Sequence, residues 1–198
     1  MSTQIAVNIR PHLVSFLFKE LEGETKAEYK SKKVKLARVT KRSSLGQLLY
    51  IFKARAYNEA ASKKVTNYNI FLSVDAEDPK QNQATINQRI NITHSQLFLL
   101  DEDVKFINNY LEGLFRLSLV NFVKGYVKHD TSSEKNNKRM YSYISTAIHE
   151  FMLDHNLYDT ETDPEALRRL YYREVKKNHL LHRFQIPIST QIKHFAML

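Results

Sequence analysis

The stretch Asp101–Gly125 has the sequence DEDVKFINNYLEGLFRLSLVNFVKG and separates two parts of the chain that differ in pattern. Its acidic first turn favours a helix N-terminus through the helix dipole. Apolar residues then recur at helical spacing as far as Val123, and Gly125 is expected to end or kink the helix. Short alternating segments come before this stretch, and longer helical patterns follow it. The sequence therefore predicts an α+β fold, with a small antiparallel β-element in the N-terminal half and a helical C-terminal half.

Alternation and capping residues predict the elements of the N-terminal half. Strands are expected at Gln4–Ile9, around Val34–Val39, and at Val65–Val74 and Ile86–Ile92, the last two paired as a hairpin with a long connection. Helices are expected at His12–Glu22 after Pro11, with Gly23 ending the helix, and from Ser43 or Ser44 to about Tyr57, with Leu45, Leu48, Leu49 and Phe52 as its apolar stripe.

The last third of the chain predicts a pair of helices. The polar segment His129–Asn137, HDTSSEKNN, is interpreted as a linker, and a helix is expected from Lys138 to Asn156. After a loop at Leu157–Thr162, Asp163-Pro164 supplies an N-cap and a first helical residue for a helix to about Leu181. This is an αα unit of helix-turn-helix proportions, although its loop is long and lacks the usual glycine. Domains are expected at 1–136 and 137–198, or as one continuous domain over 1–198.

Composition excludes several classes of protein. The 198 residues contain no cysteine, which excludes a disulfide scaffold, a thiol enzyme and a cysteine zinc site. The four glycines are isolated, which excludes a phosphate-binding glycine loop. The longest apolar stretches are interrupted by charges, and no basic and apolar leader is visible. We therefore expect a cytoplasmic protein.

Candidate catalytic and metal-binding residues form no complete set. His149 and His155 are six residues apart and fall on different faces of a helix. His179 and His182 share a face, but no nearby carboxylate completes a ligand set. Asp75, Glu77, Asp78 and Lys80 are of the residue types found in the active sites of metal-dependent nucleases. They are predicted to lie in a polar turn and not on a sheet, where such a site needs its carboxylates. We expect no metal, no cofactor and no enzymatic activity.

The net charge of +9 comes from two blocks. Residues 19–64 carry thirteen basic and five acidic side chains, and residues 164–198 carry seven and two. Two such blocks bind a polyanion if folding brings them onto one surface, and otherwise act as solvated faces that favour solubility. Whether they share a surface is left open by the sequence.

The first block contains seven cations in thirteen residues, without an acid: Lys30, Lys32, Lys33, Lys35, Arg38, Lys41 and Arg42. As an ordered hairpin or loop it would follow a phosphate backbone, and a flexible basic arm is the alternative. Tyr29, Tyr50 and Tyr57 are close enough in sequence to stack on exposed bases, but core or surface roles are the simpler interpretation.

The second block lies in Glu165–Leu181, EALRRLYYREVKKNHLL. Its apolar stripe is expected to contain Leu167, Leu170, Tyr171 and Val175. A different face gathers a tyrosine and four cations: Arg169, Tyr172, Arg173, Lys176 and Lys177. A helix with one packed side and one basic, aromatic side suits phosphate contact or insertion into a major groove, and a basic surface helix without a ligand is the alternative.

Three segments also carry a resemblance. NIRPHLVSFLF at Asn8–Phe18, SLG at Ser44–Gly46 and EALRRLYYREVKKN from Glu165 onward resemble short basic proteins of bacteriophages and mobile elements in Bacteroidetes-type bacteria. The resemblance implies phage-associated work on DNA, or a place in the virion.

The sequence thus leads to two hypotheses. The first is a non-enzymatic nucleic-acid-binding protein, with duplex DNA favoured as the partner, acting as a phage-type accessory or regulatory factor. The alternative is a structural or interaction protein, such as a homo-oligomeric virion component, because the apolar stripe of Val104–Val127 is broad enough to form a subunit interface.

Overall fold

A computed structural model describes residues 3–21, 25–29, 32–59, 69–75, 88–89, 96–130 and 137–176. The chain forms two compact units, Met1–Asn108 and Asn109–Leu198, and the boundary falls inside the helix α3 (Asp101–Asp130). The sequence pattern predicted a boundary at 136/137 or one continuous domain. In the structure the second part of α3 packs on the helices that follow it.

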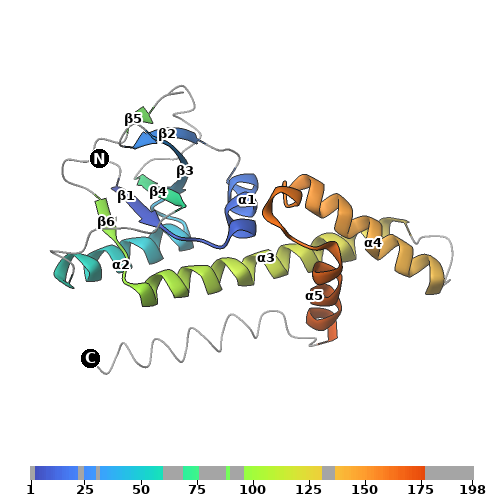
Figure 1. Ribbon diagram of the computed structural model, residues 1–198. Helices are drawn as coiled ribbons and strands as arrows, with labels where there is room; N and C mark the ends of the chain where they lie inside the picture. Colours follow the sequence, from blue (N-terminus) through green and yellow to red (C-terminus); the bar gives the residue numbers. More distant parts are fainter. Residues whose placement is uncertain are drawn as a thin grey trace. The chain divides into compact units, whose positions relative to one another are not determined.

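The first unit contains a six-stranded mixed sheet (Figure 1) with the strand order β5-β2-β3-β4-β1-β6. The strands are β1 (Thr3–Val7), β2 (Thr25–Tyr29), β3 (Lys32–Thr40), β4 (Ile70–Asp75), β5 (Gln88–Arg89) and β6 (Gln96–Phe98). Two helices belong to the same unit, α1 (Pro11–Glu20) and α2 (Ser44–Glu59). The predicted α+β class is confirmed, and the sheet is larger than the small antiparallel element that we expected.

Strand pairing corrects one prediction. β4 lies between β3, with which it is parallel, and β1, with which it is antiparallel, so both of its edges are occupied. β5 pairs instead with β2. The expected hairpin between Val65–Val74 and Ile86–Ile92 is therefore wrong, and only parts of the two segments, Ile70–Asp75 and Gln88–Arg89, are described as strands.

The centre of the sheet is buried on both faces. Ile5, Leu72 and Ala37 are neighbours across β1, β4 and β3, and none is exposed to solvent. The residues beside them point to the opposite face, because side chains alternate along a strand, and Phe71 and Leu36 are equally buried there. Strands covered on both sides have nearly continuous apolar sequences, as IFLSV in β4 has.

Helix α2 begins as the sequence predicted. The Ser43 Oγ accepts the Gly46 N–H at 3.0 Å, which identifies Ser43 as the N-cap. Of the expected apolar stripe, Leu45, Leu49 and Phe52 are buried and Leu48 is half-buried. The helix connects the parallel strands β3 and β4 and packs against both of them and against β6.

The first turns of α3 are hydrogen-bonded to the segment that connects β1 and α1. The Asn108 side chain accepts the Arg10 N–H at 2.9 Å and donates to the Asn8 carbonyl at 3.0 Å. The Phe106 ring makes an edge contact with Phe52 of α2, with ring centroids 5.5 Å apart. These contacts explain why the first turns of α3 belong to the first unit.

The second unit contains the rest of α3 together with α4 (Asn137–Asp154), a short 3₁₀ helix η2 (Tyr158–Thr160) and α5 (Pro164–Lys176). The rings of Phe115 and Phe122 on α3 make edge contacts with the fully buried ring of Phe151 on α4, with ring centroids 5.7 and 5.5 Å apart. α3 continues to Asp130, so Gly125 does not end it. Part of the expected linker, residues 131–136, and the predicted last segment after Lys176 lie outside the described residues.

The turn after α4 contains no glycine, and Asn156 takes the left-handed conformation that glycine usually adopts there. Asn156 has φ 51°, and the Leu157 N–H donates to the Met152 carbonyl at 2.9 Å. This is a Schellman motif, in which asparagine can take the place of glycine. Leu157 is fully buried beyond it. The αα unit therefore has an ordered turn even though glycine is absent.

Candidate nucleic-acid interface

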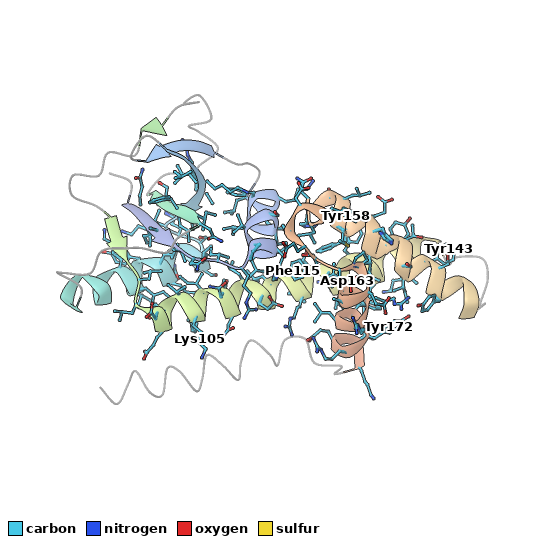
Figure 2. The ribbon with its side chains drawn as sticks, in the orientation of Figure 1. Lys105, Phe115, Tyr143, Tyr158, Asp163 and Tyr172 are labelled. Carbon is cyan, nitrogen blue, oxygen red and sulfur yellow. The ribbon has the colours of Figure 1, made fainter. Side chains whose placement is uncertain are left out.

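The N-terminus of α5 is set by Asp163 and Pro164, as predicted. The Asp163 Oδ1 accepts the Glu165 N–H at 3.0 Å, and Pro164 occupies the first helical position, where no N–H is needed. Figure 2 shows Asp163 at the start of α5 and Tyr172 further along the same helix. The start of the helix determines which side chains face the other helices and which face solvent.

One face of α5 is buried, and it differs from the predicted stripe at one position. The buried side chains are Leu167, Leu170, Tyr171 and Glu174, at the i, i+3, i+4 and i+7 spacing of a helical face. Val175, which we expected in the stripe, is half-buried. A glutamate at the fourth position was missed because sequence patterns assign charged residues to the surface.

Glu174 is accommodated by an arginine that is 58 residues away in sequence. The Glu174 Oε1 lies 3.1 Å from Nη1 of Arg116 on α3, and the Arg116 Nε lies 2.7 Å from the Glu112 Oε1. The three side chains are only 3%, 18% and 11% exposed for Glu174, Arg116 and Glu112. We call these three residues the Arg116 cluster. It joins the buried face of α5 to α3 through a guanidinium between two carboxylates.

The opposite face of α5 carries the predicted basic residues. Arg169, Tyr172, Arg173 and Lys176 are all exposed and have the same i, i+3, i+4 and i+7 spacing, displaced by two residues from the buried set. At roughly 100° per residue, two residues place this face on the far side of the helix. We call these four residues the α5 basic face. Lys177 lies outside the described residues.

Acidic residues lie at the N-terminal end of the α5 basic face. Nη2 of Arg169 is 3.8 Å from the Asp163 Oδ2, and both side chains are well exposed. Arg168 pairs with Glu165, and its guanidinium lies 4.6 Å from the centre of the Tyr141 ring. Arg173 and Lys176 lie further along the helix, in its last turns, away from these two carboxylates.

Two adjacent tyrosines connect the buried and exposed faces. The Tyr171 and Tyr172 rings meet edge to face, with centroids 5.6 Å apart and planes at 65°. Burial raises the pKa of the Tyr171 hydroxyl, and the neighbouring Tyr172 raises it further. Tyr172 is 43% exposed. The α5 basic face thus includes an aromatic ring that rests on a buried one.

The first basic block belongs to the other unit, and most of it is part of the sheet. Residues 32–40 form β3, which pairs with β2 as an antiparallel hairpin, so a flexible arm is the wrong description for them. The Lys35 Nζ lies 5.9 Å from the Phe18 ring centre and the Lys41 Nζ 4.4 Å from that of Tyr50. Arg42 is exposed and Arg38 half-buried.

For three further predicted residues of this block, the structure describes the backbone alone or nothing. Lys32 and Lys33 are in β3 without a described side chain, and Lys30 lies outside the described residues. Tyr50 is exposed beneath the ammonium of Lys41, whereas the side chains of Tyr29 and Tyr57 are not described. The two blocks belong to different units, the first to Met1–Asn108 and the second to Asn109–Leu198.

The histidines that prompted a metal hypothesis have partners of another kind. The His149 Nδ1 lies 2.6 Å from the Tyr158 hydroxyl, and the buried His155 Nδ1 lies 2.9 Å from the Phe151 carbonyl. Among the described residues no group of three His, Cys, Asp or Glu could hold a metal ion. Asp75 ends strand β4. The other nuclease-like residues, Glu77, Asp78 and Lys80, lie outside the described part of the chain, and so do His179 and His182.

Comparisons with protein-family models, with curated proteins and with solved structures found no match to this chain. In the described residues, no helix has the length and apolar character needed to cross a membrane. The interpretation of α5 therefore rests on its own geometry.

Proposed function

We propose that this protein binds duplex DNA through the α5 basic face and acts as a non-enzymatic accessory or regulatory factor of phage type, working in the host cytosol. The observation that carries the proposal is the division of α5 into two faces. Leu167, Leu170 and Tyr171 hold one face in the unit, and three cations and a tyrosine occupy the other. A helix presented in this way can contact phosphates and reach base edges in the major groove.

The surroundings of α5 support this role. The Arg116 cluster and the capped N-terminus give the helix a defined orientation, which a recognition helix needs because base contacts depend on register. In the proposal, the first block adds phosphate contacts through the exposed Lys35, Lys41 and Arg42, together with Lys30, Lys32, Lys33 and Arg38.

Salt dependence tests the proposal directly. We expect the affinity for duplex DNA to fall steeply as salt rises, because each phosphate contact releases counterions. In the triple variant R169A/R173A/K176A, affinity at low salt should fall roughly 10- to 100-fold, and the salt slope should become shallower by about 2 to 3. Fluorescence anisotropy with labelled duplex at several salt concentrations measures both quantities.

A matched control keeps the net charge equal. Lys105, Lys124 and Lys128 are exposed on α3, and K105A/K124A/K128A removes the same three charges. We expect this variant to bind almost as tightly as the wild type. Equal loss in both variants would mean that only the total charge matters, and salt-insensitive or absent binding by the wild type would reject the function itself.

Asp163 should weaken binding, because its carboxylate competes with phosphate for Arg169. In Asp163→Asn the N-cap is kept, since asparagine caps as well as aspartate, but the charge 3.8 Å from Arg169 is lost. We expect affinity for duplex DNA to rise about two- to fivefold at low salt and the gain to vanish at high salt. Asp159→Asn, at another exposed site in the same loop, is the control. An unchanged affinity in D163N would show that this pair does not compete.

The alternative is an oligomeric virion component, which the broad apolar stripe of Val104–Val127 suggested. Leu111, Phe115, Leu119 and Val123 of this stripe are buried within the single chain, so this part of it forms the core. Light scattering of the purified protein checks it, since a large stable assembly without DNA affinity would favour the alternative.

A further inference from the structure

Tyr172 differs from the other exposed tyrosines of the second unit. The Tyr141 ring lies under the Arg168 guanidinium, and the Tyr158 hydroxyl is 2.6 Å from His149 Nδ1. Among the described residues, Tyr172 makes an edge-to-face ring contact with Tyr171 and no hydrogen bond, ion pair or cation–π contact. Tyr172 is 43% exposed, so part of its side chain is open to solvent and available to a ligand.

The Tyr172 ring also packs against a buried neighbour. Tyr171, against which it packs at 65°, is 7% exposed and belongs to the buried face of α5. A ring that is already ordered loses little conformational entropy when a ligand covers it, which is why tyrosine is effective at binding surfaces. The contact with Tyr171 therefore lowers the entropic cost of covering Tyr172 with a ligand.

Cations lie on both sides of the ring along the helix. Arg169 precedes Tyr172 by three residues and Lys176 follows it by four, so the two lie one turn away in either direction. If these cations contact phosphates on the two sides of a major groove, the residue between them faces the base edges. There the thymine C5-methyl is the apolar group available to a ring.

We propose that Tyr172 contacts the methyl group of a thymine in the major groove of duplex DNA, so that the α5 basic face discriminates between sequences as well as holding phosphates. This inference rests on the proposed function and names the base-contacting residue of the same site. Arg169, Arg173 and Lys176 supply salt-dependent affinity, and Tyr172 supplies a preference that depends little on salt.

The test begins with a selection from random duplexes, which identifies the sequence that the wild-type protein prefers. Affinity is then measured for that duplex, for a scrambled duplex, and for the preferred duplex with deoxyuridine in place of each thymidine in turn. Deoxyuridine removes the C5-methyl and leaves base pairing intact. We expect one substitution to weaken wild-type binding about three- to tenfold. Y172F should respond in the same way, and Y172A should bind the preferred, scrambled and deoxyuridine-substituted duplexes alike.

The outcomes separate the two proposals. If the wild-type protein does not bind duplex DNA, the proposed function fails. If it binds but shows no preferred sequence, no sensitivity to deoxyuridine, or the same sensitivity in Y172A, the role of Tyr172 is overturned and the function stands. Tighter binding to single-stranded than to duplex DNA also overturns it, because the ring would then stack on unpaired bases. Thermal unfolding verifies that Y172A is folded, as expected for an exposed side chain.

Discussion

Replacing Gly46 with alanine should destabilise the first unit by about 2 kcal/mol or more. An alanine Cβ at this position would lie 2.1 Å from the Thr40 carbonyl oxygen and 2.9 Å from the Lys41 Cα. Both are backbone atoms, which cannot rotate aside as a side-chain end can. The turn between β3 and α2 would have to move away from the first turn of the helix.

The position of Thr40 explains why the displacement is costly. Its carbonyl accepts the Ser43 N–H at 3.0 Å and the Ser43 Oγ–H at 2.7 Å, and Ser43 caps α2. Movement of the carbonyl would strain both hydrogen bonds and the cap. The prediction reverses the usual rule, because alanine in place of glycine stabilises an ordinary helix interior by about 1 kcal/mol.

Gly125 provides the matched control. It lies inside α3, and an added Cβ would meet nothing within 4 Å. Gly125→Ala should therefore raise stability by about 1 kcal/mol, the ordinary helix-propensity gain. Urea or thermal unfolding followed by circular dichroism measures both variants. A Gly46→Ala protein as stable as the wild type would show that the turn is not as tight as described.

Arg116→Met should produce the second large effect, a loss of about 3 to 5 kcal/mol in the stability of the helical unit. The substitution keeps an apolar stem of similar length but removes the guanidinium from between Glu112 and Glu174. The Glu174 side chain is only 3% exposed, so water cannot replace the charged contact with Arg116 that is lost. Urea unfolding measures the loss.

A double variant distinguishes the loss of the ion pair from the loss of simple packing. In Arg116→Met with Glu174→Met, both charges of the 3.1 Å contact are removed together, and we expect much of the stability to return. Arg168→Met is the control, since it breaks an exposed pair with Glu165 and should cost at most about 1 kcal/mol. If the double variant is less stable than Arg116→Met, the Arg116 cluster does not act as a charge pair.

The candidate site could be predicted to a large extent because it lies on one helix. Asp163-Pro164 marked the start of α5, and the spacing of Arg169, Tyr172 and Arg173 placed them on one face. Helical periodicity is a local property, so sequence was sufficient. The exception was Glu174, which the predicted apolar stripe did not include. Its burial depends on Arg116, which is on a different helix.

The sheet shows the opposite case. β1 and β3 were expected from their alternation, whereas β2 and β6 were not, and the predicted partner of β4 was wrong. β4 is central because it pairs with β1, about seventy residues earlier, and with β3, about thirty-five residues earlier. Pairing energy between strands depends on which faces become buried together, and a local pattern does not contain that information.

Sequence alone thus determined the α+β class, the main helices and the two faces of α5, because helix caps and the 3.6-residue period act between neighbours along the chain. Only the tertiary structure decided the strand order, the burial of Glu174 beside Arg116 and the close approach that requires Gly46. Each of these depends on a contact made through space, either between segments far apart in sequence or, at Gly46, where a turn folds back on the helix that follows it.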